Sequence, residues 1–417
     1  MTSLSLPFRA SMMDSSKSFP NIKSQFPIFE KSLKDWAYLD NAATTQKPEA
    51  VIQSITKFHT EENANIHRGL YPLSAHATRH YEEVRSKVKS WLGAQDENEI
   101  AFTHGTTESI NIVANSFAHQ LKEGDEILIT AMEHHANLIP WQEACHQAKA
   151  TLNYIPLQTN GDLALENFSR LLTPKTRLVS LTHISNTLGT VNPIPFILEE
   201  AHKRHIPVML DAAQSVGHTP VNISDLDIDF LAFSAHKMFG PMGSGVLYVN
   251  RKHHALIRPL NYGGGAIKEV SLQNTKLRDY PFCLEAGTPN ISGVIGLGEA
   301  IDFLTGLDTH EMDRYTRHLA HTFREALSSL PFVSLVGHPA KYSGIVSFVV
   351  DGIHAHDVAG FLADKKIAVR AGHHCTQPLY DQLGLPATVR ASFSIYNSSD
   401  EIDRVKEALI NLKKFWA

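Results

Sequence analysis

The sequence predicts an α/β protein, with a large domain built on a mostly parallel sheet and a smaller C-terminal α/β domain. Two observations support this prediction. From Trp36 to about Gly293, short apolar segments alternate with helical patterns, and such alternation favours a parallel sheet covered by helices on both faces. After Gly293 two helices precede two strands, which indicates a second unit, and 417 residues are enough for two or three domains.

The expected strands of the large domain are short, apolar and bounded by polar or Gly-rich turns. They are residues 100–103, 127–130, 177–182, 207–210, 230–233 and 245–249. Helices are expected at residues 81–92, where apolar side chains recur on one face before Gly93, and at residues 107–121. Each helix follows or precedes a strand, as a βαβ arrangement requires.

The smaller unit is expected to hold helices at residues 296–304 and 311–327 and strands at 345–350 and 368–370. A closing helix at 398–416 begins with Ser398 and Glu401, which fit a capping box. The predicted division is an N-terminal arm at 1–30, a large domain at 31–300 and a small domain at 301–417 that carries the loop of Cys375.

Composition excludes several classes of protein. The formal charge is −5, which gives no reason to expect nucleic acid as a partner, and no apolar run approaches a membrane span. Three cysteines cannot form a disulfide framework and indicate a reducing compartment, so cytoplasm is expected. The first 25 residues are rich in Ser and hold one acid, Asp14, which faintly resembles a transit peptide and leaves an organelle as the alternative.

Two polar residues follow apolar strands in a suggestive pairing. Asp211 ends the strand before Ala212, and Lys237 follows the strand at 230–233. A lysine at a strand end usually reaches solvent, but a desolvated lysine can act as an amine nucleophile and form a Schiff base. Pyridoxal phosphate needs such a lysine together with an acid against its pyridine nitrogen, so the pair predicts this cofactor.

Two weaker motifs precede this pair along the chain. Gly105, Thr106 and Thr107 lie between a strand and a helix, where free N–H groups and hydroxyls bind phosphate. His134 follows the strand at 127–130, where a histidine is more often packed or solvated than stacked on a cofactor ring. Each motif alone has an ordinary structural explanation, but their joint order strengthens the prediction.

Cys375 lies beside His373 and His374 and near Arg370. Adjacent residues rarely direct all their side chains to one metal ion, so no metal is predicted. Neighbouring positive charge favours a thiolate, which makes Cys375 a candidate nucleophile. Cys145 and Cys283 lack such neighbours and are expected to be packed.

From about Tyr38 to the C-terminus, the chain resembles the cysteine desulfurases of the class V aminotransferase superfamily, which are fold-type I pyridoxal-phosphate enzymes, and within them the SufS branch. The supporting strings are YLDNAA (38–43), HRG (67–69), GTT (105–107), MEHHAN (132–137), DAAQ (211–214), SAHK (234–237), EAGTPN (285–290), RAGHHC (370–375) and RAS (390–392). The uninterrupted RAGHHC string marks the branch.

The resemblance implies a role for each matching residue. Lys237 would hold the cofactor covalently, Asp211 would face its pyridine nitrogen, Gln214 its ring hydroxyl, and His134 would stack on the ring. The phosphate would be held by Thr106, Thr107, Ser234 and His236, with Thr288 reaching the neighbouring subunit's phosphate in a homodimer. Asn186, Arg390 and Arg370 would bind the substrate, and Cys375 would receive its sulfur.

The implied reaction converts L-cysteine to L-alanine and leaves a persulfide on Cys375, with Lys237 and His134 as the other catalytic residues. A compact Cys375 loop implies a SufE-like or SufU-like acceptor, and the family's product feeds iron–sulfur cluster assembly. Three alternatives stay open at this stage. The nearest rival is a selenocysteine lyase or another class V aminotransferase-type enzyme, which would keep Lys237 and Asp211 but need not use Cys375. A non-catalytic scaffold would keep only the fold, and the presence of Lys237, Asp211 and His134 argues against it. A metallohydrolase built on the 24 histidines is disfavoured because they lack ligand spacing.

Overall fold

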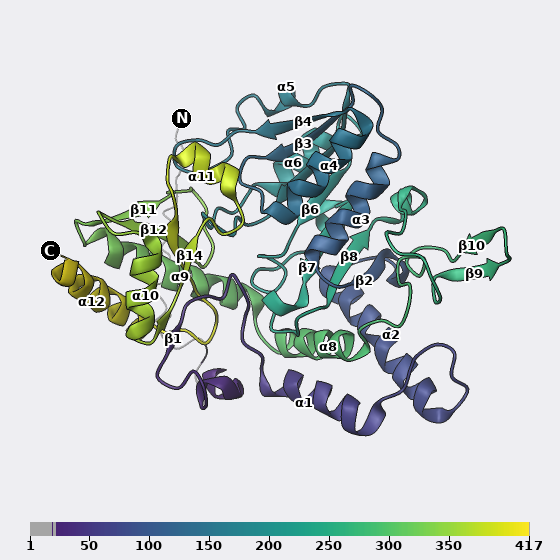
Figure 1. The fold of residues 1–417 in the computed structure, drawn as a ribbon, viewed down its shortest axis with the longest axis horizontal. Helices are drawn as coiled ribbons and strands as arrows, with labels where there is room; N and C mark the ends of the chain where they lie inside the picture. The colour runs from purple at the N-terminus through teal and green to yellow at the C-terminus, as the bar shows by residue number, and fades with distance from the viewer. Residues whose placement is uncertain (1–18, 20–21, 417) are drawn as a thin grey trace, which may run out of the picture.

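The computed structural model describes residue 19 and residues 22–416. The two largest sheets, of seven and four strands, each with its own helices, lie side by side in Figure 1. The segment that resembles a transit peptide lies largely outside the described residues. No described helix combines the length and the apolar character that a membrane crossing needs.

The larger sheet has seven strands in the order β2-β8-β7-β6-β5-β3-β4. They are β2 (Ile100–Thr103), β3 (Glu126–Thr130), β4 (Thr151–Ile155), β5 (Thr176–Thr182), β6 (Val208–Asp211), β7 (Phe230–Ser234) and β8 (Gly245–Val249). Only the pairings of β8 with β2 and β7 are antiparallel. The carboxyl ends of the other six strands therefore meet at one edge, which is where open α/β sheets bind ligands.

Alternate residues of the central strands bury opposite faces of this sheet. In β3, Ile127 and Ile129 belong to one buried cluster and Leu128 to another, as the period of two in a strand requires. The first cluster includes side chains of α3 (Thr106–Ala118) and α4 (Ile139–Ala148). The second includes side chains of α2 (Pro72–Leu92), α6 (Ile194–His202) and α8 (Ile291–Thr305). The prediction of a mostly parallel sheet with helices on both faces is confirmed.

The smaller sheet is antiparallel, with strands β11 (Val333–Val336), β12 (Ile345–Val350), β15 (Thr388–Ser392) and β14 (Arg370–Gly372) in that order. Its helices are α9 (Thr309–Ser328), α10 (Ala355–Asp364) and α12 (Ser399–Trp416), whose side chains share one buried cluster with those strands. At the start of α12, the Ser398 backbone N–H donates to Glu401 Oε2 at 3.4 Å, which is one half of the predicted capping box.

The expectation of a single strand at 368–370 is wrong. β13 (Ile367–Ala368) pairs with β1 (Ala37–Tyr38), and after Val369 the chain enters β14 of the four-stranded sheet. Two short pairings form because the chain crosses between two partners at this point. The β1–β13 pairing brings the residues that follow Tyr38 against the small sheet, where Asp40 bridges to Ser392.

Other elements begin or end away from the expected positions. The helix expected at 81–92 begins at Pro72, because proline at the first turn starts the helix before its apolar face becomes regular. The helix expected at 107–121 ends at Ala118. The remaining elements are α1 (Glu49–Lys57), η4 (Phe58–Glu62), α5 (Phe168–Leu171), α7 (Ile223–Leu226), β9 (Ile267–Val270), β10 (Thr275–Leu277), α11 (Gln377–Leu383) and the short 3-10 turns η2 (Ile22–Gln25), η3 (Pro27–Phe29), η5 (Glu97–Glu99), η6 (His135–Asn137), η7 (Ala235–Lys237) and η8 (Arg251–Leu256).

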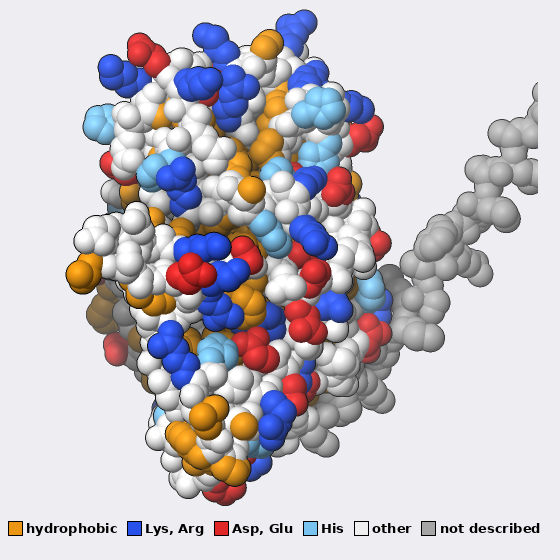
Figure 2. All heavy atoms as spheres, turned by 90° about the vertical axis from the view of Figure 1, so that its right-hand side faces the viewer, with side chains coloured by type: hydrophobic (Ala, Val, Ile, Leu, Met, Phe, Trp, Pro, Cys, Tyr) orange, Lys and Arg blue, Asp and Glu red, His pale blue; other side chains and the backbone are white. Residues whose placement is uncertain are grey.

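The β9–β10 hairpin protrudes from the large domain at the right of Figure 1. Figure 2 views the molecule from that side and shows acidic and basic side chains intermixed between separate hydrophobic patches. Neither sign of charge therefore dominates this face. On the hairpin itself, Val270 and Leu272 are exposed, at 63% and 100% of their surface.

Candidate active site

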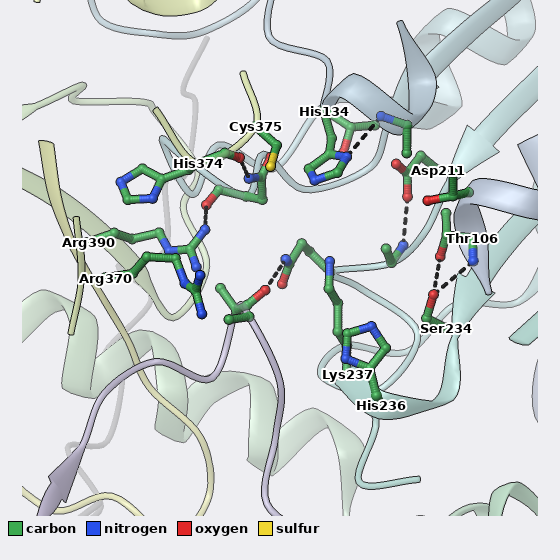
Figure 3. A pocket seen from close by; sticks show the side chains of 18 of the residues that line it. Thr106, His134, Asp211, Ser234, His236, Lys237, Arg370, His374, Cys375 and Arg390 are labelled. Carbon is green, nitrogen blue, oxygen red and sulfur yellow. Dashed lines mark hydrogen bonds between the residues drawn. The ribbon is translucent and has the colours of Figure 1, made fainter. Parts of the chain in front are cut away.

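A cavity of about 500 Å³ opens at the carboxyl edge of the seven-stranded sheet. Figure 3 shows Thr106, Asp211 and Ser234 on one side of it and Arg370, Arg390 and His374 on the other, with Lys237 and Cys375 between them. On the first side, Asp211 and Ser234 end strands β6 and β7 and Thr106 begins α3, whereas the residues on the second side belong to the small sheet and the loop after β14. The pocket is thus made by both sheets together.

Lys237 reaches the pocket from the 3-10 turn that follows β7. Burial lowers the pKa of Lys237, with Asp211 opposing that shift. Its Nζ has no ion pair and no hydrogen bond within the part of the chain that the structure describes. Burial also raises the pKa of Asp211, whose Oδ1 accepts from the backbone N–H of Ala213 at 3.0 Å. A reactive amine and a buried carboxyl thus share one cavity.

His134 follows β3 and lines the pocket. Burial, with Lys237 as the next cause, lowers the pKa of His134 to about 3, so the ring is neutral at pH 7. Nδ1 accepts a hydrogen bond from the backbone N–H of Ala136 at 3.0 Å. The single ring proton is therefore on Nε2.

The start of α3 forms a cradle of hydroxyl and amide groups. Ser234 Oγ accepts from the Thr106 N–H at 2.8 Å and lies 2.7 Å from Thr106 Oγ1. Gly105 precedes them with φ of +154°, and an added Cβ would lie 3.1 Å from Ser234 Oγ. The helix start leaves N–H groups for an anion at the point where Thr107 and His236 also line the pocket.

These residues fit pyridoxal phosphate. The cradle at α3 suits its phosphate, and the carboxyl of Asp211 suits its protonated ring nitrogen. Gln214 lines the same cavity and uses one amide hydrogen on the Ala42 carbonyl, at 2.8 Å. Within the described residues, His236 Nδ1 and Arg390 Nε are buried without a hydrogen-bond partner. Buried polar atoms are rarely left unpaired, so both are available to a bound molecule.

Two arginines of the small sheet converge on Asp40. Arg370 donates to both carboxylate oxygens, from Nε at 3.1 Å and from Nη2 at 2.8 Å. Arg390 Nη2 lies 3.4 Å from Oδ1, and its Nη1 donates to the Asn186 carbonyl at 2.9 Å. Burial lowers the pKa of Arg390 to about 10, which still leaves it cationic at pH 7. Asp40 therefore holds two arginine side chains in place at one side of the pocket.

Cys375 is exposed and lies in a strained loop. His374 and Cys375 both have left-handed backbones, with φ of +49° and +60°. The loop is tied to the large domain, because the His135 N–H donates to the Cys375 carbonyl at 2.7 Å and Asn186 Nδ2 donates to the His374 carbonyl at 2.7 Å. Such strain persists only where the surroundings hold it, which is common at reactive sites.

The expectation that His374 supplies positive charge to the thiol is wrong. Burial, with Arg390 as the next cause, lowers the pKa of His374 to about 2, so the ring is neutral at pH 7. Its Nε2 lies 3.0 Å from Thr388 Oγ1, away from the thiol. Lys237, Arg370 and Arg390 line the same pocket as Cys375. The basic side chains near the thiol are therefore a lysine and two arginines.

The other sequence-based candidates fall in different places. Cys145 and Cys283 are buried, and burial raises the pKa of each thiol to about 11, as expected for packed residues. Thr288 is exposed and does not line the pocket within this described chain. Asn186 lines the pocket, but one of its amide hydrogens already holds the Cys375 loop.

Three residues of the site were missed by sequence reasoning. Asp40 lies within the YLDNAA string but only the fold brings it to the arginines. His135 holds the cysteine loop, and its Nε2 accepts from the Gln377 N–H at 3.2 Å. Glu133 lies beneath His134 and accepts from Thr130, Asn137 and Thr182, while burial raises its pKa to about 8. An acid directly before two histidines was the available signal for Glu133.

Comparison with known proteins identifies related sequences over nearly the whole chain. The aminotransferase class-V family model matches residues 37–405. The chain is 42% identical to a "Probable cysteine desulfurase" of Halalkalibacterium halodurans, covering 95% of this chain and 98% of the relative. It is also 42% identical to a "Cysteine desulfurase" of Salmonella gallinarum, covering 95% and 99%.

Solved structures agree with the sequence relatives. The cysteine desulfurase CsdA of Escherichia coli, in its S-sulfonic acid form, is 36% identical with a TM-score of 0.88 and covers 94% of this chain and 98% of its own. The apo cysteine desulfurase of Thermococcus onnurineus is 38% identical with a TM-score of 0.90, covering 94% and 97%. A C-DES mutant with glycine linked covalently to its PLP cofactor is 25% identical with a TM-score of 0.80, covering 93% and 98%.

Proposed function

This chain belongs to the aminotransferase class-V family, and from that premise we propose that it is a pyridoxal-phosphate-dependent cysteine desulfurase. It converts L-cysteine to L-alanine and keeps the removed sulfur as a persulfide on Cys375. One observation carries the proposal, which is that a single cavity holds Lys237 and Asp211 from one sheet and the exposed thiol of Cys375 from the other. The desulfurase names of the relatives support it.

The cofactor, when bound, withdraws electrons from the substrate and so makes its α-proton acidic and its carbon–sulfur bond easier to break. Asp211 would face the ring nitrogen, Gln214 the ring hydroxyl and His134 the ring face, and Lys237 would hold the cofactor covalently. Thr106, Thr107, Ser234 and His236, which line the same pocket, would hold the phosphate.

The chain's own side chains then divide the work. Arg390 is cationic at pH 7 and has Nε unpartnered, so it orients the substrate carboxylate together with Arg370 and Asn186. Lys237 Nζ, once it is no longer attached to the cofactor, would take the α-proton, because burial lowers its pKa and so favours the neutral amine. The Nε2–H group of His134 is a hydrogen-bond donor in the same pocket.

Sulfur transfer uses the exposed thiol. Cys375 Sγ attacks the substrate sulfur, so that a sulfur–sulfur bond forms as the carbon–sulfur bond breaks. The electrons of the broken bond stay with the carbon skeleton, which takes up protons to become alanine. Arg370 and Lys237 line the same pocket as Cys375, and positive charge there would stabilise the attacking thiolate.

We also propose the finer assignment to the SufS branch, based on the RAGHHC string at 370–375. A cysteine loop held by His135 and Asn186 has little reach, which supports a dedicated SufE-like or SufU-like acceptor and a role in iron–sulfur cluster assembly. Thr288 lies exposed and away from its own pocket, which supports a homodimer in which it serves the neighbouring site. We further propose the cytoplasm as location and domain limits at 1–30, 31–300 and 301–417.

The test is Cys375→Ala in the full-length, cofactor-loaded protein. This variant should retain cofactor absorbance and lose alanine formation from L-cysteine and the persulfide mass on the protein, with and without an acceptor. Cys145→Ala, which removes a buried thiol far from the pocket's lining, should retain both. Full cysteine activity in Cys375→Ala would contradict the proposal, and activity retained only with L-selenocysteine would favour a selenocysteine lyase.

A further inference from the structure

Three metal-ligating side chains meet outside the pocket, where η4 runs into α2. Glu62 is the last residue of η4, a π-helical turn, and His76 and His80 lie one turn apart on α2. One ligand atom from each lies within 4.8 Å of the other two. We call these three residues the α2–η4 cluster. His76 and His80 have the i,i+4 spacing of a metal-binding pair, although the histidines were expected to lack ligand spacing.

The carboxylate of Glu62 is directed at both histidines. Oε1 lies 3.4 Å from His76 Nε2, and Oε2 lies 3.1 Å from His80 Nδ1. The Glu62 side chain is 9% exposed, whereas those of His76 and His80 are 48% and 31% exposed. A buried carboxylate is therefore covered by two imidazoles that solvent can reach, which gives an ion a route of entry and room for water.

A lysine occupies part of this position in the structure. Lys57, at the end of α1, places Nζ 2.9 Å from Glu62 Oε1 with its side chain 60% exposed. Exposed ion pairs of lysine contribute little to stability, so Lys57, with most of its side chain exposed, can leave Glu62 at small cost. The cluster thus binds a positive charge at the place where a metal ion would compete for Glu62.

The ligand set determines the class of metal. Two imidazole nitrogens and one carboxylate oxygen suit Zn²⁺ and neighbouring transition metals rather than Ca²⁺ or Mg²⁺, which take oxygen ligands. Tetrahedral zinc with bonds of about 2.0–2.1 Å separates its ligand atoms by about 3.3 Å. Oε1 lies 3.4 Å from His76 and the other carboxylate oxygen, Oε2, lies 3.1 Å from His80. One ligand atom from each of the three residues lies within 4.8 Å of the other two, so the three side chains must move closer together to bind the ion.

We propose that the α2–η4 cluster is a divalent transition-metal site, with Glu62, His76 and His80 as protein ligands and water completing the coordination of Zn²⁺. None of the three lines the catalytic pocket. Metal binding displaces Lys57 and joins η4 to α2 across the segment that contains residues 63–71. Zn²⁺ bound there stabilises the folded chain by mass action, independently of the desulfurase chemistry.

The test uses full-length, cofactor-loaded protein carrying Cys375→Ser, so that the exposed thiol cannot bind the metal. Titration with Zn²⁺, followed by calorimetry and by metal analysis after gel filtration, should show one ion at the cluster. His76→Ala and His80→Ala should each weaken binding by tenfold or more and reduce the rise in melting temperature. Both side chains are partly exposed, so these variants should fold.

Two further variants sharpen the test. Lys57→Met should strengthen Zn²⁺ binding, because the competing cation is gone. His59→Ala removes an exposed histidine of the same turn that is not part of the cluster, and it should leave binding unchanged. Undiminished binding in His76→Ala and His80→Ala, or no binding by the parent protein, would overturn the proposal and leave the cluster a hydrogen-bonded ion pair only.

Discussion

On the large-sheet side of the pocket, His134, Asp211 and Lys237 lie at or just after the ends of strands, whereas on the small-sheet side Cys375 lies in a loop with two left-handed residues. The strands of the large side hold one another through a continuous ladder of parallel hydrogen bonds. The loop of Cys375 depends on a few bonds to His135 and Asn186.

The difference concerns how each side tolerates change. A strand end is fixed by backbone pairing and burial, so a substitution there removes a chemical group but leaves the frame. A strained loop is fixed by individual side chains, so loss of one partner moves the reactive atom itself. The large side should therefore lose chemistry when mutated, and the small side should lose geometry.

Replacement of Lys237 should give the largest effect. Lys237→Ala removes the proposed general base and the point of covalent attachment, so kcat should fall by about 10³-fold or more. The fold should persist, since the Nζ makes no hydrogen bond within the described chain. Alanine release and the cofactor's absorption spectrum measure the two effects separately.

Lys47→Met is the matched control, since Lys47 is also partly buried but donates to the His236 carbonyl at 3.2 Å rather than lining the pocket. Its kcat should fall far less. If Lys237→Ala retained more than a tenth of wild-type kcat, the large side would not carry the chemistry.

Loss of Asp40 should give the next largest effect, on the small side. Asp40→Asn leaves Arg390, 2% exposed, without its anionic partner, and kcat/KM for cysteine should fall by roughly 30-fold, or about 2 kcal/mol. Most of the loss should be in KM, because the arginines orient the substrate. Asp35→Asn removes an exposed acid that pairs with Lys366 and should leave kcat/KM unchanged. An equal loss of kcat/KM in both variants would mean that overall charge, rather than the contacts of Asp40 with Arg370 and Arg390, is responsible.

The sequence predicted the large side better than the small side for a physical reason. Strand ends can be read locally, because an apolar run followed by Asp211 or by Lys237 indicates where each strand stops. A parallel sheet then gathers those ends at one edge without further information. The order of motifs along the chain was therefore sufficient to predict this side of the site.

The small side depends on contacts between distant parts of the chain. Asp40 meets Arg370 and Arg390 across separations of 330 and 350 residues, which no local pattern reports. The neutral state of His374 follows from burial and nearby arginines, both of which are tertiary features. The division of 368–370 between two sheets has the same origin, since strand partners are set by the fold.

Acidification should lower the free energy of unfolding through both sides of the pocket, so in this respect the two sides do not differ. Burial lowers the pKa of His218 to about 4 on the large side and of His374 to about 2 on the small side. Between pH 6.5 and about 4 these histidines are protonated in the unfolded chain but stay neutral in the folded chain. The free energy of unfolding therefore decreases as the pH falls, by about 1.4 kcal/mol per pH unit for each such histidine.

His218→Gln should remove one such contribution. The free energy of unfolding, measured in denaturant from pH 7 to pH 5.5, should then depend less on pH than in the parent protein. His146→Gln replaces an exposed histidine and serves as the control. A steeper pH dependence in His218→Gln would show that the sign of the shift is wrong.

The smallest effect tests the backbone of the small side by itself. Gly372, just before the cysteine loop, has φ of +123°, and an added Cβ would meet nothing nearer than His356 Nε2 at 3.8 Å. Any cost of Gly372→Ala is therefore conformational, about 1–2 kcal/mol, with a few-fold lower kcat if the strain shifts Cys375. Gly360→Ala adds the same methyl group in α10 with no neighbour within 4 Å and should stabilise the chain by about 0.5–1 kcal/mol. If Gly372→Ala lowers the free energy of unfolding and Gly360→Ala raises it, the backbone conformation before the Cys375 loop, rather than packing, sets the cost. If both variants change it in the same direction, the distinction between the two sides of the pocket is lost.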